Sequence, residues 1–238
     1  MTGEDRIYLR HGSGGPAMRR LVREVFARRA PPSSGDMIGL DQLDDGAAVR
    51  LGDQWLVYTT DSHVVKPVFF PGGDIGRLAV SGTINDLAMM GVTRALGLAC
   101  AIVIEEGFER ESLIRIQDSI EQTCDEAGVT IGTGDTKVMS RGEVDGIVIT
   151  TTGFGFSQRL VRDAGLQPGD EILVTGTIAD HGISVLSVRH ELELSGGLLS
   201  DVAPLNHLVR CALDAVGDSI VAMKDPTRGG IASAVSEM

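Results

Sequence analysis

The residues most able to do chemistry in this chain are aspartates at the boundary between apolar, strand-like segments and glycine-rich or polar turns. Four sites have this form, at Asp45, Asp61, Asp135 and Asp225. A fifth aspartate, Asp86, follows an asparagine inside a segment with helical spacing. Carboxylates at strand ends can converge on one cleft, where their repulsion requires a cation. Hard oxygen ligands suit Mg²⁺ together with waters and substrate phosphates. Glycines let backbone N–H groups approach a phosphate. The set predicts a metal–nucleotide site for phosphoryl transfer or ATP-driven activation.

Each of these aspartates, taken alone, also has a purely structural interpretation. Asp-Gly and Asp-Pro pairs are common in turns, so a single site could be only a turn or a cap. The pair Asn85-Asp86 is harder to explain in this way, because the flanking Leu87 and Met89 are apolar and the pair needs polar partners. The five sites together favour a functional role.

Two common nucleotide-binding motifs are absent from the sequence. The P-loop pattern G-x-x-x-x-G-K-[ST] does not occur, and no G-x-G-x-x-G follows a predicted strand. The glycine-rich segment 11–15 either closes over a ligand or serves as a linker.

The composition of the chain indicates which kinds of binding partner are unfavourable. The 238 residues contain 21 Lys and Arg against 33 Asp and Glu, a net charge of −12, and only 4% aromatics. This balance argues against binding to nucleic acid or to an anionic membrane. The three cysteines form no CxxC pair, so we expect reduced thiols. The longest apolar stretch, 95–104, is too short to span a bilayer, and we expect a soluble, cytoplasmic protein.

Strand-like and helix-like segments alternate along the chain, which predicts an α/β (α+β) protein. We expect helices over 14–29, 75–90, 110–127, 182–194 and 204–216, and strands over 55–60, 95–104, 129–132, 146–153, 171–175 and 218–223. A second unit begins near residue 158, giving domains 1–157 and 158–238. Residues 231–238 look like the opening of a helix without a stop signal, and we expect the chain to be cut inside its second domain.

Several motifs resemble, in order and spacing, those of the HypE family of hydrogenase maturation factors. They lie at 11–15, 45–49, 60–65, 69–80, 82–89, 134–138 and 225–230. The string Phe-Phe-Pro-Gly-Gly-Asp-Ile-Gly at 69–76 is the most specific of them within the wider aminoimidazole ribonucleotide synthetase-like (PurM-like) superfamily.

The resemblance implies a PurM-like two-domain architecture. The N-terminal mixed sheet would pair with its copy in a homodimer, and the C-terminal α/β domain would be incomplete in this chain. ATP with Mg²⁺ would bind between the domains and across the dimer. Mapped onto this sequence, Asp45, Asp61, Asp86 and Asp135 look like Mg²⁺–phosphate ligands. Asp225 would be their counterpart in the second domain.

Lys137 would steady phosphate oxygens or assist proton transfer, as a mobile point charge can do. HypE proteins accept a carbamoyl group from a carbamoyltransferase (HypF) onto a C-terminal cysteine. They use ATP to dehydrate this thiocarboxamide to a thiocyanate. The cyanide then passes, through a HypC–HypD scaffold, to the iron of a nickel–iron hydrogenase.

The resemblance therefore implies an ATP-dependent carbamoyl dehydratase, a lyase. This chain would lack the carrier cysteine and would be inactive by itself. The alternatives are another ATP-using member of the superfamily, of the selenophosphate synthetase or thiamine-monophosphate kinase type, and a non-catalytic assembly module.

Overall fold

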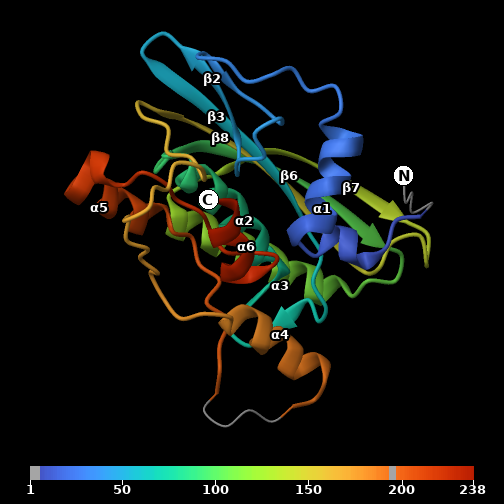
Figure 1. The fold of residues 1–238 in the computed structure, drawn as a ribbon. Coiled ribbons are helices and arrows are strands. Elements are labelled where there is room, and N and C mark those ends of the chain that lie inside the picture. Colours follow the sequence, from blue (N-terminus) through green and yellow to red (C-terminus); the bar gives the residue numbers. More distant parts are fainter. Residues whose placement is uncertain (1–5, 193–196) are drawn as a thin grey trace.

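A six-stranded mixed sheet is the main element of the fold in the computed structural model, which describes residues 6–192 and 197–238 (Figure 1). Its strands, in spatial order, are β1 (Met37–Ile38), β2 (Ala47–Leu51), β3 (Gln54–His63), β8 (Ile147–Ser157), β6 (Ala95–Glu105) and β7 (Ile131–Met139). Only β6 and β7 run parallel, and the other neighbours are antiparallel. The predicted mixed α/β class is confirmed.

Helices and one short hairpin complete the described part of the chain. They are η1 (Leu9–Gly12), α1 (Gly15–Leu21), the π-helical η2 (Val22–Phe26), the hairpin β4 (Phe69–Phe70) and β5 (Gly73–Asp74), α2 (Ile75–Met89), α3 (Arg110–Ala127), α4 (Asp180–Arg189), α5 (Asn206–Val216), η3 (Gly217–Ser219) and α6 (Gly230–Glu237). Among the described helices, none has the length and apolar character that a bilayer crossing requires.

Helices α2 and α3 cover one face of the sheet and form the main core with it. Asp74 begins α2, because its Oδ1 accepts hydrogen bonds from the backbone N–H groups of Gly76 and Arg77 at 2.7 and 3.0 Å. Gly128 ends α3 in the left-handed conformation, as its position in the sequence predicts. The core packs apolar side chains of these two helices against those of β6 and β8. Thr59 and Asp61 of β3 and Asp86 of α2 lie where these elements face each other.

The opposite face of the sheet carries exposed side chains and is called the open face below. Along β8 the side chains alternate, with Ile149 and Thr151 buried under the helices and Phe154 and Phe156 partly exposed on the other face. Tyr58 of β3 also lies exposed and pairs with Phe154 in the register. An apolar, aromatic surface of this kind is typical of an interaction face.

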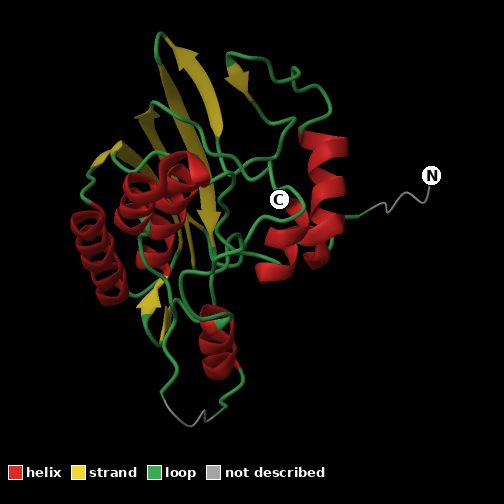
Figure 2. Cartoon of the chain, turned by 60° about the vertical axis from the view of Figure 1, so that its left-hand side comes forward, coloured by secondary structure: helices red, strands yellow, loops and turns green. Residues whose placement is uncertain are grey.

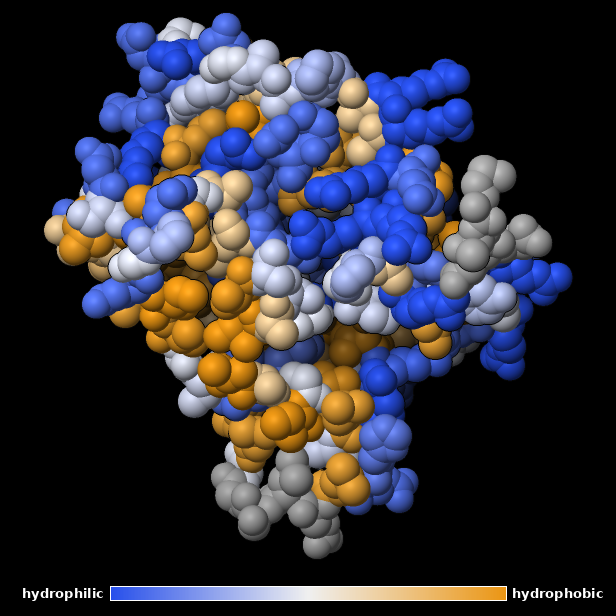
Figure 3. All heavy atoms as spheres, in the orientation of Figure 1, coloured by the Kyte–Doolittle hydropathy of each residue, from blue (hydrophilic) through white to orange (hydrophobic). Residues whose placement is uncertain are grey.

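Loops dominate the described residues after 158 (Figure 2). The strands expected at 171–175 and 218–223 are wrong: 171–175 is irregular, and the other segment contributes one isolated bridge, between Ala222 and Arg162. A strand is stable only when a neighbour completes its hydrogen bonds, and Leu173 is instead 87% exposed. Apolar side chains also gather at the surface around α4, in the lower part of Figure 3.

Candidate metal–nucleotide site

Three carboxylates from distant parts of the sequence converge at one end of α2. Asp45 lies in the loop before β2, Asp86 lies in α2 and Asp225 lies in the loop before α6. One oxygen from each carboxylate lies within 4.8 Å of the others. The structure therefore brings together three of the five aspartates that the sequence singled out.

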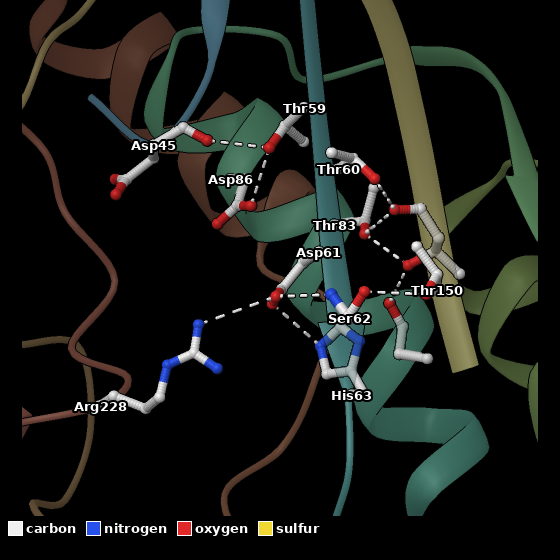
Figure 4. A network of polar contacts seen from close by, with 12 residues as sticks. Asp45, Thr59, Thr60, Asp61, Ser62, His63, Thr83, Asp86, Thr150 and Arg228 are labelled. Atoms are coloured by element: carbon white, nitrogen blue, oxygen red, sulfur yellow. Dashed lines mark hydrogen bonds and ion pairs between the residues drawn. The ribbon is translucent and has the colours of Figure 1, made fainter. Parts of the chain in front are cut away.

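Thr59 of β3 fixes two of these groups relative to each other. Its Oγ1 lies 2.9 Å from the backbone oxygen of Asp45 and 3.0 Å from Oδ2 of Asp86 (Figure 4). Asn85, the neighbour of Asp86, points elsewhere. Its side chain donates to the backbone oxygen of Ala203 at 3.1 Å and accepts from the backbone N–H of Leu205 at 2.7 Å. Asn85 thus holds the second half of the chain, and Asp86 faces the carboxylates.

Burial and mutual repulsion make the three acids hard to ionise together. The pKa of Asp225 is raised to about 7, mainly by burial and in addition by the nearby charge of Asp45. Burial also raises the pKa of Asp86 well above its usual range, with added repulsion from Asp225, Asp45 and Asp61. The pKa of Asp45 is raised by burial, although Lys224 opposes the shift. Such a group binds either protons or a cation.

The donors fit a hard divalent cation. Asp225, which supplies one of the three converging carboxylates, is nine-tenths buried. Oδ2 of Asp45 is buried and has no hydrogen-bond partner among the residues that the structure describes. Buried, unpartnered carboxylate oxygens are costly unless a ligand satisfies them, and carboxylates are the usual protein ligands of Mg²⁺.

Asp61 lies near this group and is held in its ionised form. It was expected directly after a strand, but it lies inside β3, which continues to His63. Its carboxylate accepts from the backbone N–H of Ser62 at 2.8 Å, contacts Nε2 of His63 at 3.1 Å and lies 3.8 Å from the Arg228 guanidinium (Figure 4). Burial alone would raise the pKa of Asp61, but the hydrogen bond with His63 and the charges of His63 and Arg228 lower it overall.

Two glycine-containing loops meet beside these carboxylates. A Cβ atom on Gly14, whose φ is +81°, would lie 2.5 Å from the backbone oxygen of Arg228, so only glycine permits this contact. The contact seats the glycine-rich segment 11–15 against the loop that carries Asp225 and Arg228. The guanidinium of Arg228 lies 3.8 Å from Asp61, so one cation stands beside the acidic group.

Asp135 and Lys137 lie apart from this group within the chain. They were expected in a turn, but β7 continues through both, and they form an ion pair at 3.2 Å with each side chain about two-thirds exposed. The register aligns Asp135 with Ala101, Thr150 and Ser62 on the open face of the sheet, whereas Asp61 faces α2.

Lys224 is a site residue that sequence reasoning missed. Its ammonium contacts Oδ1 of Asp45 at 2.8 Å and Oδ2 of Asp163 at 2.9 Å, and it is only 10% exposed. Its position directly before Asp225 was the available signal.

Comparisons with known proteins identify the family to which the chain belongs. Residues 43–157 match the family described as AIR synthase related protein, N-terminal domain, and residues 167–238 match the corresponding C-terminal domain. A putative hydrogenase expression/formation protein of Methanocaldococcus jannaschii is 48% identical over 98% of this chain and 69% of its own length. The carbamoyl dehydratase HypE of Azotobacter vinelandii is 46% identical, over 96% of this chain and 65% of its own length.

Solved structures of HypE proteins are also similar to this chain. The HypE–HypF complex matches with a TM-score of 0.82 and 44% identity over 91% of this chain and 68% of that chain. A HypE structure in complex with ATP matches with a TM-score of 0.74 and 42% identity, over 98% of this chain and 68% of that chain. A thiamine monophosphate kinase from Aquifex aeolicus is only 16% identical, with a TM-score of 0.54, and shares the fold alone.

The chain spans about two thirds of the length of these curated relatives. The matches extend over nearly the whole of this chain and include its carboxylate-bearing segments. The chain belongs to the AIR synthase related protein family and, within it, to the HypE family of hydrogenase maturation proteins.

Proposed function

We propose that this protein acts in hydrogenase maturation as an ATP-dependent carbamoyl dehydratase. Its reaction would convert a cysteine S-carboxamide into a thiocyanate, the source of a cyanide ligand for nickel–iron hydrogenase. The observation that carries the proposal is the convergence of Asp45, Asp86 and Asp225 in a chain whose relatives are named carbamoyl dehydratase HypE. A relative with ATP bound supports ATP as the nucleotide.

Mg²⁺ would be held by the three converging carboxylates, with Asp61 beside them. Arg228 would bind phosphate oxygens, because its guanidinium lies beside Asp61. The glycines of the two loops would let backbone N–H groups approach the same phosphate. Bound Mg²⁺–ATP would supply the phosphoryl group that turns the carboxamide oxygen into a leaving group.

The dehydration balances as loss of one water from R–S–C(=O)–NH₂ to give R–S–C≡N. The carbon–oxygen bond breaks, the oxygen leaves with the phosphoryl group, and the nitrogen gives up both protons. The protein must therefore position the carboxamide oxygen near the phosphate and provide a proton acceptor near the nitrogen. Lys137 is our candidate for steadying phosphate oxygens or for assisting this proton transfer.

The buried thiols of this chain are unsuited to carry the carboxamide. Cys100 and Cys124 are both buried, and burial raises the pKa of each, to about 11 for Cys124. A thiol must ionise to attack a carbamoyl donor, and these two do so poorly. We infer that neither of these two cysteines carries the carboxamide that enters the site.

We also propose a homodimer formed through the open face of the sheet. The support is the exposed aromatic set on that face, Tyr58, Phe154 and Phe156. A second copy would also explain how Asp135 and Lys137 take part, since within one chain they stand away from the other carboxylates. A carbamoyltransferase of the HypF type is the proposed donor partner, since a relative forms a HypE–HypF complex, with a HypC–HypD-type scaffold as the acceptor.

Nucleotide binding is the first test. Titration calorimetry with ATP and Mg²⁺ should show binding to the chain, and Asp86→Asn should weaken it strongly. Asp214→Asn, on the exposed side of α5, serves as a control that leaves binding unchanged. Unchanged affinity in Asp86→Asn would remove the carboxylate group from the nucleotide site.

Catalysis is tested with a thiocarboxamide borne by a cysteine peptide. Mass spectrometry should show loss of one water that requires ATP. ATP binding without hydrolysis or dehydration would instead favour the non-catalytic assembly module.

The role of a second copy can be tested by mixing two inactive variants. If Asp135 acts across a dimer, mixed Asp86→Asn and Asp135→Asn chains form hybrid dimers with one intact site, and ATP hydrolysis returns in part. Absence of any recovery, with mixed dimers verified by mass spectrometry, would argue against a role across the dimer.

A further inference from the structure

A lysine lies among the carboxylates of the site and joins three segments of the chain. The ammonium of Lys224 contacts Asp45 at 2.8 Å, Asp163 at 2.9 Å and Glu237 at 3.6 Å. These acids come from the loop before β2, from the segment after β8 and from α6. The lysine side chain is nine-tenths buried, so these contacts are sheltered from solvent and are weakly screened.

The backbone around Lys224 is aligned by the same junction. The N–H of Met223 donates to the backbone oxygen of Arg162 at 3.1 Å, which sets Lys224 opposite Asp163. Arg162 in turn bonds through Nε to Oδ2 of Asp44 at 2.8 Å. Two cations from the second half of the chain thus bind two adjacent acids of the first half.

This arrangement has a direct consequence for the metal site. Lys224 binds Oδ1 of Asp45, whereas Oδ2 is buried and receives no hydrogen bond from any residue in the described part of the chain. Lys224 is also the chain neighbour of Asp225, so the contact that holds Asp45 also fixes where Asp225 can lie. Residues that orient metal ligands in this way strongly affect metal affinity.

We propose that Lys224 is a positioning residue that assembles the metal site before the cation arrives. Its ammonium offsets part of the repulsion among the carboxylates, leaves one oxygen of Asp45 for the cation, and places Asp225 beside Asp45 and Asp86. The inference rests on the proposed function in one respect, because it takes these three carboxylates to be the Mg²⁺ ligands.

The main competing interpretation is that Lys224 weakens metal binding. An ammonium next to a ligand carboxylate also repels a divalent cation, so Lys224 could act only as a competitor of the metal. The two roles predict opposite signs. Loss of an assembling residue weakens Mg²⁺ binding, whereas loss of a competitor strengthens it.

The test uses the full chain and measures Mg²⁺ affinity by titration calorimetry, without nucleotide. Lys224→Met keeps the length of the side chain and removes the charge, and we expect it to weaken Mg²⁺ binding about 10- to 100-fold. Lys224→Arg keeps the charge and should retain most of the affinity. Lys66→Met is the matched control, because it removes the same charge from an exposed ion pair with Asp145, outside the carboxylate group.

A second variant protects the test against simple unfolding. Lys224→Met leaves Asp163 buried without its cation, and the double variant Asp163→Asn/Lys224→Met removes that charge. We expect the double variant to unfold at a higher temperature than Lys224→Met and to show the same loss of Mg²⁺ affinity. This split between stability and affinity is what a merely structural lysine would not give.

The outcomes separate this inference from the proposed function. If the unmodified chain binds no Mg²⁺, the assignment of the carboxylates as metal ligands fails, and the inference fails with it. The other outcome is that the unmodified chain binds Mg²⁺, and that Lys224→Met and Asp163→Asn/Lys224→Met bind it as tightly or more tightly. In that case only the positioning role of Lys224 is overturned.

Discussion

Replacing Asp225 by asparagine should stabilise the metal-free protein at high pH and have little effect at low pH. The pKa of this buried carboxyl is raised from 3.8 to about 7 by burial and by the charge of Asp45. Each pKa unit corresponds to about 1.4 kcal/mol, so the ionised form costs at most about 4 kcal/mol relative to the unfolded chain. Asparagine has nearly the same shape as a protonated carboxyl and carries no charge at any pH.

The direction in which stability changes with pH follows from proton binding to Asp225. Between pH 4 and 7 the folded protein holds a proton on Asp225 that the unfolded chain has released, so the contribution to stability falls as pH rises through this window. The unmodified protein should therefore lose stability from pH 5 to pH 8, and Asp225→Asn should show a shallower fall. Part of the fall in stability with pH should remain in this variant, because the pKa values of Asp86 and Asp45 are raised as well.

Urea unfolding in the presence of a chelator, at pH 5 and at pH 8, measures this difference. Asp214→Asn, on the exposed surface of α5, is the control and should change neither value. Mg²⁺ added at pH 8 should stabilise the unmodified protein more than Asp225→Asn, since binding to the folded state adds to its stability. A variant no more stable than the unmodified protein at pH 8, or equally favoured at both pH values, would refute the electrostatic argument.

Gly91→Ala should destabilise the protein by well over the roughly 1–2 kcal/mol of left-handed backbone strain, because its Cβ would lie 2.5 Å from a backbone oxygen. Gly52→Ala, where φ is also positive but nothing lies within 4 Å, should show that strain alone, and equal unfolding free energies would contradict the contact. Asn85→Ala should cost about 1–3 kcal/mol and speed hydrogen exchange in the segment that Asn85 binds; unchanged exchange would count against this tether. Iodoacetamide should modify the exposed Cys211 before the buried Cys124, as peptide mass spectrometry would show, and the reverse order would disprove the burial of Cys124.

The helices of the first half were predictable because their signals are local. Apolar spacing and the glycines that end the helices act within a few residues, and the observed α2 and α3 begin and end at or within one residue of the expected positions. The strands at 171–175 and 218–223 were predicted from apolar content alone. A strand also needs a neighbour at the right distance, and the sequence of the strand itself does not contain that information.

The residue types of the candidate site could be predicted from the sequence, but its geometry could be predicted only in part. Residue types near glycine turns indicated carboxylate ligands, and Asp45, Asp86 and Asp225 converge. Asp135 carries the same local signal, but side chains alternate across a strand, and the register places it on the other face. Lys224 was missed because its partners are 179 and 61 residues away in the sequence, and only the fold brings them together.

The site and the junction between the two halves of the chain are one structure. On α2, Asp86 faces the carboxylate group and its neighbour Asn85 binds the backbone at Ala203 and Leu205. On the other side, Lys224 binds Asp45 while the next residue, Asp225, completes the group. Each half thus places a ligand and a tether next to each other in sequence. If these carboxylates hold Mg²⁺ as proposed, loosening either tether should weaken cation binding, and the cation should in turn strengthen the contact between the two halves, because linkage is reciprocal.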